Sequence, residues 1–217
     1  MICGPTSCGK TVFITNFLKY LAQMSDTRFE RILLYYTEWQ PAYQQLSCDN
    51  SVSIEFHEGL PKTEDYSRDP EKPKLLILDD LMRESSIASV VNLLVKASHH
   101  CNLSIFFLSQ NLFHRGQREI SLNSNYIVIF KNPRDRSQIQ YLARQLCPEN
   151  PKFLQEAYAD AVSQPFHYLL LDLKQETAEN CRYRTCIFPF DPHQYVYVPR
   201  KQIKSTSSID NVAVVRL

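Results

Sequence analysis

An eight-residue segment near the start of the chain constrains its fold and its ligand more than any other feature. The segment matches the phosphate-binding pattern G-x-x-x-x-G-K-[ST] at every fixed position, and it consists of Gly4, Pro5, Thr6, Ser7, Cys8, Gly9, Lys10 and Thr11. Glycines let backbone N–H groups approach phosphate oxygens, and the lysine reaches the β and γ phosphates. The chain has only 4 glycines, and two of them occupy the required positions. The segment therefore predicts a nucleoside triphosphate site in which Lys10 is catalytic.

The residues on the two sides of this segment fit the pattern unequally. After it, residues 11–24 carry apolar side chains near helical spacing, which predicts a helix whose N-terminal dipole favours phosphate. The Thr11 hydroxyl is expected to bind Mg²⁺. Before it, only Met1 to Cys3 precede the first glycine, whereas a strand usually has about five or six residues. We therefore expect the first strand to be truncated.

The composition suits one globular domain with a sizeable core. The chain has 217 residues, 44% of them hydrophobic, and its 24 basic and 23 acidic residues give a net charge of +1. Any contact with nucleic acid must therefore be local. The 7 cysteines include no C-x-x-C pair, which argues against a zinc site or a disulfide framework. No signal peptide or apolar run of roughly 20 residues is seen, so we expect a soluble intracellular protein without a membrane partner.

Short apolar runs alternate with helical patterns along most of the chain. The runs expected to be strands are Ile32–Tyr36, Val52–Phe56, Leu75–Leu78, Leu103–Leu108, Tyr126–Phe130 and Tyr168–Leu171. The later helices are expected at Ser86–His99, Arg134–Leu146 and Pro151–Val162, and an exposed loop at Lys62–Lys74. This alternation predicts an α/β fold, a three-layer P-loop NTPase fold with a mostly parallel central sheet. We expect a core over residues 1–176, followed at 177–217 by an extension with edge strands and a flexible end.

Two adjacent carboxylates follow one of the buried apolar runs. Leu75–Leu78 leads directly into Asp79 and Asp80. In a nucleotide site, Asp79 is expected to hold Mg²⁺ through water, and Asp80 to act as the general base for the attacking water. An acidic cap for the next helix is the alternative. The phosphate-binding segment upstream favours the catalytic interpretation.

Polar and basic residues after the next apolar run supply further candidates. Gln110 lies where ligands of parallel sheets bind, and it is expected to sense the γ-phosphate or to position water. An amide that caps the turn is an equal alternative. One interpretation of the basic loop that follows is an arginine finger, which acts on the γ-phosphate of a neighbouring subunit, and a solvated surface charge is the favoured alternative for each arginine. We favour Arg118, with Arg115, Arg134 and Arg136 as rivals.

Together these motifs resemble the FtsK–HerA superfamily of P-loop ATPases, most closely the poxvirus-type genome-packaging ATPases of large DNA viruses and Polinton (Maverick) elements. The resemblance extends from Ile2 to Leu173, and its more family-specific strings lie at residues 56–61, 107–113, 120–123 and 129–135. It implies a ring-shaped homo-oligomer that uses ATP and Mg²⁺ to push double-stranded DNA into a capsid. Capsid or portal proteins are the implied partners. If the gene is viral, the implied location is the host nucleus or cytoplasm. These motors more often have a glutamate where Asp80 stands.

Two other functions remain open on the sequence. A small-molecule P-loop kinase would share the phosphate-binding segment, although Asp80 and Gln110 suit water activation better. An inactive element-derived copy that only binds partners is the second alternative, and the intact motifs argue against it. Trp39, after the second expected strand, either touches DNA or a neighbouring subunit or is buried against the next helix. The basic residues near the C-terminus either contact phosphates or form a solvated surface; they are Arg182, Arg184, Arg200, Lys201 and Lys204.

Overall fold

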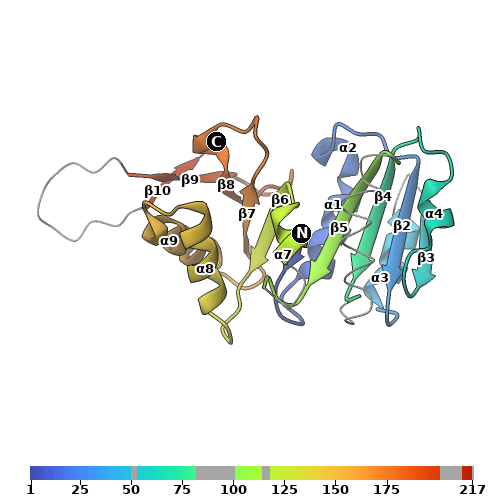
Figure 1. Cartoon of the computed structure of the whole chain (residues 1–217), viewed down its shortest axis with the longest axis horizontal. Coiled ribbons are helices and arrows are strands. Elements are labelled where there is room, and N and C mark those ends of the chain that lie inside the picture. The colour runs from blue at the N-terminus through green and yellow to red at the C-terminus, as the bar shows by residue number, and fades with distance from the viewer. Residues whose placement is uncertain (50–52, 82–100, 114–117, 201–211, 217) are drawn as a thin grey trace, which may run out of the picture. The chain divides into compact units, whose positions relative to one another are not determined.

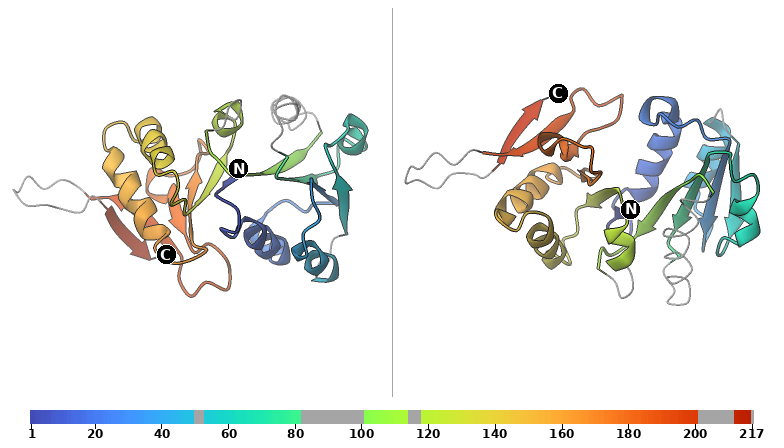
Figure 2. Two further views of the ribbon diagram at one scale, coloured as in Figure 1. Left: turned by 90° about the horizontal axis from the view of Figure 1, so that it is seen from below. Right: turned by 45° about the horizontal axis from the view of Figure 1, so that its top comes forward.

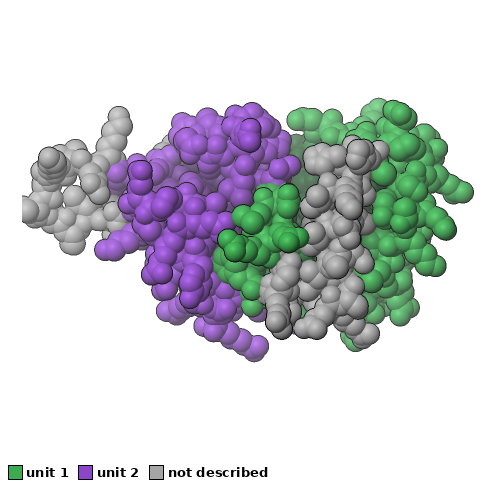
Figure 3. All heavy atoms as spheres, viewed as in Figure 1, with its two compact units in different colours: residues 1–3, 10–124 green, residues 4–9, 125–217 purple. Residues whose placement is uncertain are grey.

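The described part of the chain forms two compact units. A computed structural model describes residues 1–49, 53–81, 101–113, 118–200 and 212–216 (Figure 1). Unit 1 consists of residues 1–3 and 10–124, and unit 2 of residues 4–9 and 125–217 (Figure 3). The expected boundary at residue 176 falls inside unit 2. The expected helix Ser86–His99 and the candidate Arg115 lie outside the described residues.

Unit 1 is built on a parallel sheet. Its strands are β1 (Ile2–Cys3), β2 (Arg31–Tyr36), β3 (Ile54–Glu58), β4 (Lys74–Asp79) and β5 (Leu103–Ser109). They lie in the order β1-β5-β4-β2-β3, and every neighbouring pair runs parallel. All six residues of β4 are buried, as expected for an apolar run with a strand on each side. The predicted α/β class is confirmed.

Helices lie on both faces of the unit 1 sheet. They are α1 (Lys10–Lys19), α2 (Leu21–Met24), α3 (Ala42–Asp49), α4 (Thr63–Ser67) and α7 (Arg118–Leu122). α1 and α3 pack side by side on one face, and α7 lies over the other face (Figures 1 and 2). The two central strands β2 and β4 are therefore well protected from water.

Two sequence predictions in unit 1 need correction. The expected helix up to Met24 is interrupted at Tyr20, whose φ of −106° and ψ of 23° are not helical. The segment expected to be an exposed loop, residues 62–74, contains α4. The Asp65 carboxylate accepts a hydrogen bond from the Lys62 backbone N–H at 2.8 Å, which satisfies one of the donors at the start of that helix.

Unit 2 combines an antiparallel sheet with a pair of helices. Its strands are β6 (Tyr126–Phe130), β7 (Tyr168–Asp172), β8 (Tyr183–Thr185), β9 (Tyr195–Pro199) and β10 (Val212–Arg216), each antiparallel to the next. Helices α8 (Ser137–Leu146) and α9 (Pro151–Ala161) pack together, and α9 packs on β7. β10 pairs with β9, and the segment expected to be flexible, Ser205–Ser208, lies outside the described residues. Among the helices of the described ranges, none has the length and apolar character of a membrane span.

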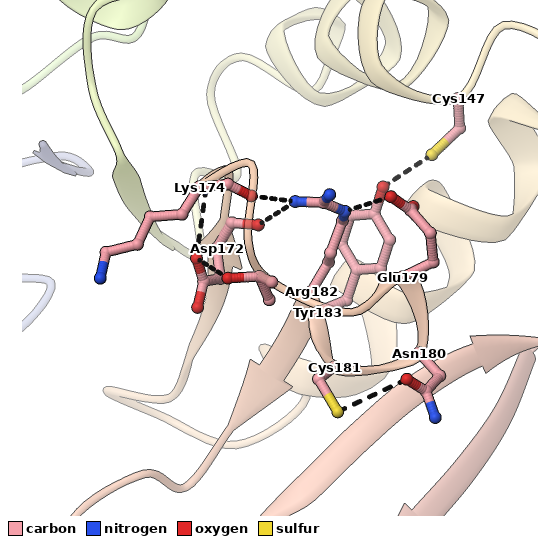
Figure 4. Close-up of polar contacts among 9 residues, drawn as sticks. Cys147, Asp172, Lys174, Glu179, Asn180, Cys181, Arg182 and Tyr183 are labelled. Atoms are coloured by element: carbon pink, nitrogen blue, oxygen red, sulfur yellow. Dashed lines mark hydrogen bonds and ion pairs between the residues drawn. The ribbon is translucent and has the colours of Figure 1, made fainter.

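A polar network connects β7 to β8 in unit 2 and involves two of the basic candidates. The Arg182 guanidinium donates to the backbone oxygens of Asp172 and Lys174, at 3.2 and 2.8 Å, and to the Glu179 carboxylate at 2.8 Å (Figure 4). Arg184 forms an ion pair with the buried Asp172 carboxylate. These two guanidinium groups therefore stabilise a turn. Two further basic candidates lie outside the described residues, Lys201 and Lys204.

Candidate nucleotide-binding site

The loop of residues 4–9 requires glycine at both of the predicted positions. A Cβ atom on Gly4 would lie 2.6 Å from Cys8 Sγ and 2.7 Å from Phe130 Cβ, which is closer than real Cβ contacts allow. Gly9 has a φ of +110°, where other residues are strained, and a Cβ atom there would lie 3.3 Å from the Phe130 ring. Phe130 at the end of β6 thus sets the space available to the loop backbone, although the sequence pattern does not include it.

The two groups predicted to hold Mg²⁺ are joined in unit 1 through one glutamine. Thr11, the second residue of α1, donates from Oγ1 to Gln40 Oε1 at 3.1 Å. Gln40 Nε2 in turn donates to Asp79 Oδ2 at 3.5 Å. A carboxylate only accepts hydrogen bonds, so the amide nitrogen must face Asp79, and the amide oxygen must face Thr11. The structure thus brings together residues from three separate segments of the chain.

The donor set of this network fits a magnesium ion. The single proton of the Thr11 hydroxyl goes to Gln40, so its oxygen lone pairs can face a cation. Gln40 and Tyr43 both donate hydrogen bonds to Asp79 Oδ2, and neither donates to Asp79 Oδ1. In the described ranges, no group of three or more His, Cys, Asp or Glu residues could hold a metal. The Thr11 hydroxyl and Asp79 Oδ1 are the kind of oxygen ligand that Mg²⁺ prefers, since this ion typically takes one or two protein oxygens together with water and phosphate.

Asp79 is a buried carboxyl group with a dedicated hydrogen-bond donor. It is the last residue of β4 and is 4% exposed. Burial raises its pKa, whereas the hydrogen bond from Tyr43 and the positive charge of Lys10 oppose that rise. The Tyr43 hydroxyl, on α3, donates to Asp79 Oδ2 at 2.6 Å, and burial followed by the charge of Asp79 raises the pKa of this tyrosine. Tyr43 thus provides a short, fixed hydrogen bond to the negative charge.

Asp80 and Gln110 meet at the ends of two neighbouring strands. Because β4 and β5 are parallel and adjacent, the residues that follow them lie at the same edge of the sheet. Gln110 Nε2 donates to Asp80 Oδ1 at 3.1 Å and to Oδ2 at 3.2 Å. Asp80 has a φ of 55°, a left-handed conformation that aspartate tolerates better than most residues. The proposed base and the proposed water-positioning amide are therefore in direct contact.

None of the described arginine candidates takes part in these hydrogen bonds. Arg118 is the first residue of α7, is exposed, and forms no ion pair within the described part of the chain. Arg134 and Arg136 are exposed in unit 2, before α8. An arginine that acts on a neighbouring subunit needs an exposed position, so the assignment of Arg118 stays a prediction.

Sequence reasoning missed Gln40 and Tyr43, which lie around Trp39. The Trp39 ring packs against Tyr36, Tyr43 and Phe56, with ring centroids 5.4, 5.5 and 5.3 Å away, yet it remains 46% exposed. Trp39 thus contacts Tyr43 of the next helix, but the expected burial is wrong, because about half of the side chain is in solvent. The aromatic spacing in this segment could have indicated such a cluster, but no local signal links Tyr43 to Asp79.

Tyr43→Phe is expected to lower the free energy of unfolding by about 1.5–3 kcal/mol, because a buried carboxylate loses a hydrogen bond. Urea denaturation measures this change. Tyr36→Phe is the matched control, since the Tyr36 hydroxyl makes no hydrogen bond within the described residues, and it should change stability by less than about 0.5 kcal/mol. Equal effects of the two substitutions would show that the Tyr43–Asp79 bond contributes nothing to folding.

Among known proteins, similarity to this chain is found in solved structures. No protein-family model matches the chain, and no curated protein matches it. Among solved structures, it is similar to the genome packaging NTPase B204 from Sulfolobus turreted icosahedral virus 2, which was determined in complex with ATP-gammaS. The two share 11% sequence identity with a TM-score of 0.47, and the similarity covers 81% of this chain and 92% of that chain.

Proposed function

We propose that the chain hydrolyses ATP in the presence of Mg²⁺. The observation that carries this proposal is the hydrogen-bonded series Thr11–Gln40–Asp79, which joins the end of the phosphate-binding segment to the carboxylate at the end of β4. Thr11 would hold Mg²⁺ directly and Asp79 through water, and Lys10 would contact the β and γ phosphates. When bound, the ion would neutralise part of the negative charge on the phosphates.

Asp80 and Gln110 provide the proton transfer that hydrolysis needs. Asp80 takes a proton from the attacking water as general base. Gln110 Nε2 holds both carboxylate oxygens of Asp80, so that the amide oxygen of Gln110 is available to orient the water. A small-molecule kinase would instead have to exclude water from this position, and an exposed glutamine does not serve that purpose.

We further propose that hydrolysis drives translocation of double-stranded DNA by a ring of identical subunits, which packages a viral or virus-like genome into a capsid. The family resemblance of the sequence supports this finer proposal. The exposed position of Arg118 supports a role for this residue across a subunit boundary, at the γ-phosphate of a neighbour. Capsid or portal proteins are the remaining partners in this proposal.

Steady-state phosphate release with and without double-stranded DNA tests both proposals. We expect turnover that DNA stimulates, and Lys10→Ala should abolish it. Release without any added acceptor distinguishes hydrolysis from a kinase reaction. If DNA left the turnover unchanged, the proposal of ATP hydrolysis would stand and the proposal of DNA translocation would be rejected. A folded wild-type protein with no turnover under either condition would reject hydrolysis and favour a chain that only binds partners.

A further inference from the structure

Phe166 occupies a turn position that normally favours glycine. Gln164 to His167 form a turn in which the His167 N–H donates to the Gln164 carbonyl oxygen at 3.4 Å. Pro165 stands second in the turn and Phe166 third, with a φ of 64°. Proline followed by a residue with positive φ is typical of a type II turn, in which glycine or asparagine takes the third place. A bulky aromatic residue at this position strains the backbone.

The strained residue also carries an exposed ring beside the phosphate-binding loop. Phe166 is 66% exposed, the largest fraction among the large hydrophobic side chains that the structure describes. A Cβ atom on Gly9 would lie 3.4 Å from Phe166 Cδ1 and 3.5 Å from Phe166 Cβ, so this residue lies against the loop backbone within unit 2. The ring makes no aromatic contact within the described residues.

Folding alone therefore gives no reason for phenylalanine at this position. Backbone strain and exposure of an apolar ring are both unfavourable, and strained residues of this kind cluster at functional sites and ligand clamps. The adjacent loop predicts which ligand is involved, because it binds the phosphate end of a nucleotide. The nucleobase is tied to those phosphates through the ribose, and it offers a flat π surface that an aromatic ring can stack on.

We propose that Phe166 is the platform on which the nucleobase of the bound nucleoside triphosphate stacks. This inference rests on the proposed function, because it assumes that the loop of residues 4–9 holds the triphosphate. Every base has a π face, so stacking tolerates different bases. The site is therefore expected to accept ATP and GTP with similar affinity. Stacking on one aromatic ring corresponds to roughly 5- to 150-fold in affinity when the ring is removed.

Calorimetric titration with ATP and with inorganic tripolyphosphate, each with Mg²⁺, separates the contribution of the nucleobase to binding from that of the phosphates. Phe166→Ala should weaken ATP binding by about tenfold or more and leave tripolyphosphate binding unchanged. Phe190→Ala is the matched control, since Phe190 is also in unit 2 and is 51% exposed, and it should change neither affinity. Phe166→Trp should keep its affinity for ATP. ATP should quench the fluorescence of the new tryptophan and tripolyphosphate should not, and the wild type, with Trp39 as its single tryptophan, gives the background signal.

Phe166→Gly separates a ligand platform from a structural support. Glycine relieves the positive φ, so the variant should be at least as stable as the wild type while it loses ATP affinity as Phe166→Ala does. Equal weakening of ATP and tripolyphosphate would mean that Phe166 only supports the loop and would overturn the inference. Unchanged ATP affinity in Phe166→Ala would overturn it and leave the proposed function intact. A wild-type protein that binds neither compound would overturn both.

Discussion

Asp80→Asn is expected to reduce the ATP turnover number by about 10²- to 10⁴-fold, with little change in ATP affinity. The amide cannot accept a proton at neutral pH, but it keeps the size of the carboxylate and can still hydrogen bond to Gln110. The position of Asp80 against Gln110 makes the effect specific to proton transfer. Turnover comes from phosphate release, and affinity from calorimetry under conditions where ATP is not consumed.

Two further variants sharpen this prediction. Asp26→Asn is the matched control, because Asp26 is exposed in the same unit and makes no ion pair within the described ranges, and its turnover should equal that of the wild type. Asp80→Glu should retain part of the turnover, since the longer side chain keeps the carboxylate. If Asp80→Asn hydrolysed ATP as fast as Asp26→Asn, the general base would have to be sought elsewhere.

Gly4→Ala is expected to abolish nucleotide binding and to lower the free energy of unfolding by about 1–3 kcal/mol, as overpacking typically does. The new methyl group would overlap Cys8 Sγ and Phe130 Cβ. Phe130 is 1% exposed on β6 and has no room to retreat, so the loop must move away. The cysteine can be shortened, and Gly4→Ala combined with Cys8→Ala should recover part of the stability. Urea denaturation and ATP titration measure the two effects.

Gly59→Ala controls for backbone strain without a clash. Gly59 has a φ of +90°, but nothing lies within 4 Å of a Cβ atom placed on it. This variant should lose about 1 kcal/mol of stability through its left-handed conformation and should bind ATP normally. Retention of ATP affinity in Gly4→Ala would refute the steric argument for the loop.

The predictable parts of this protein are those with short-range sequence signals. The apolar run before Asp79 is long enough to indicate a strand buried on both faces, and the adjacent carboxylates indicate where that strand ends. The fixed spacing of Gly4 and Gly9 likewise indicated a loop in which both positions require glycine. Once strands β4 and β5 were placed, the meeting of Asp80 with Gln110 followed from parallel topology alone.

The unpredicted parts depend on contacts distant in the sequence or on an unusual choice of residue. Gln40 and Asp79 are 39 positions apart in the sequence, and no local sequence pattern at either residue indicates that they interact. One helix between two strands usually makes a parallel crossover, whereas the packed pair α8 and α9 returns the chain so that β7 runs antiparallel to β6. The turn at Phe166 has no glycine at its third position, so the sequence did not indicate a turn there.

The central position of β4 has a mechanical consequence. All six residues of this strand are laddered to β2 on one side and to β5 on the other, so a pull along its axis must shear both ladders at once. A densely packed element of this kind transmits strain and does not absorb it by stretching. Gln40 and Trp39, by contrast, follow β2 outside any ladder. We therefore expect β4 to hold the Asp79 carboxylate in a fixed position, whereas Gln40 reaches that carboxylate from a segment that no strand pairing holds.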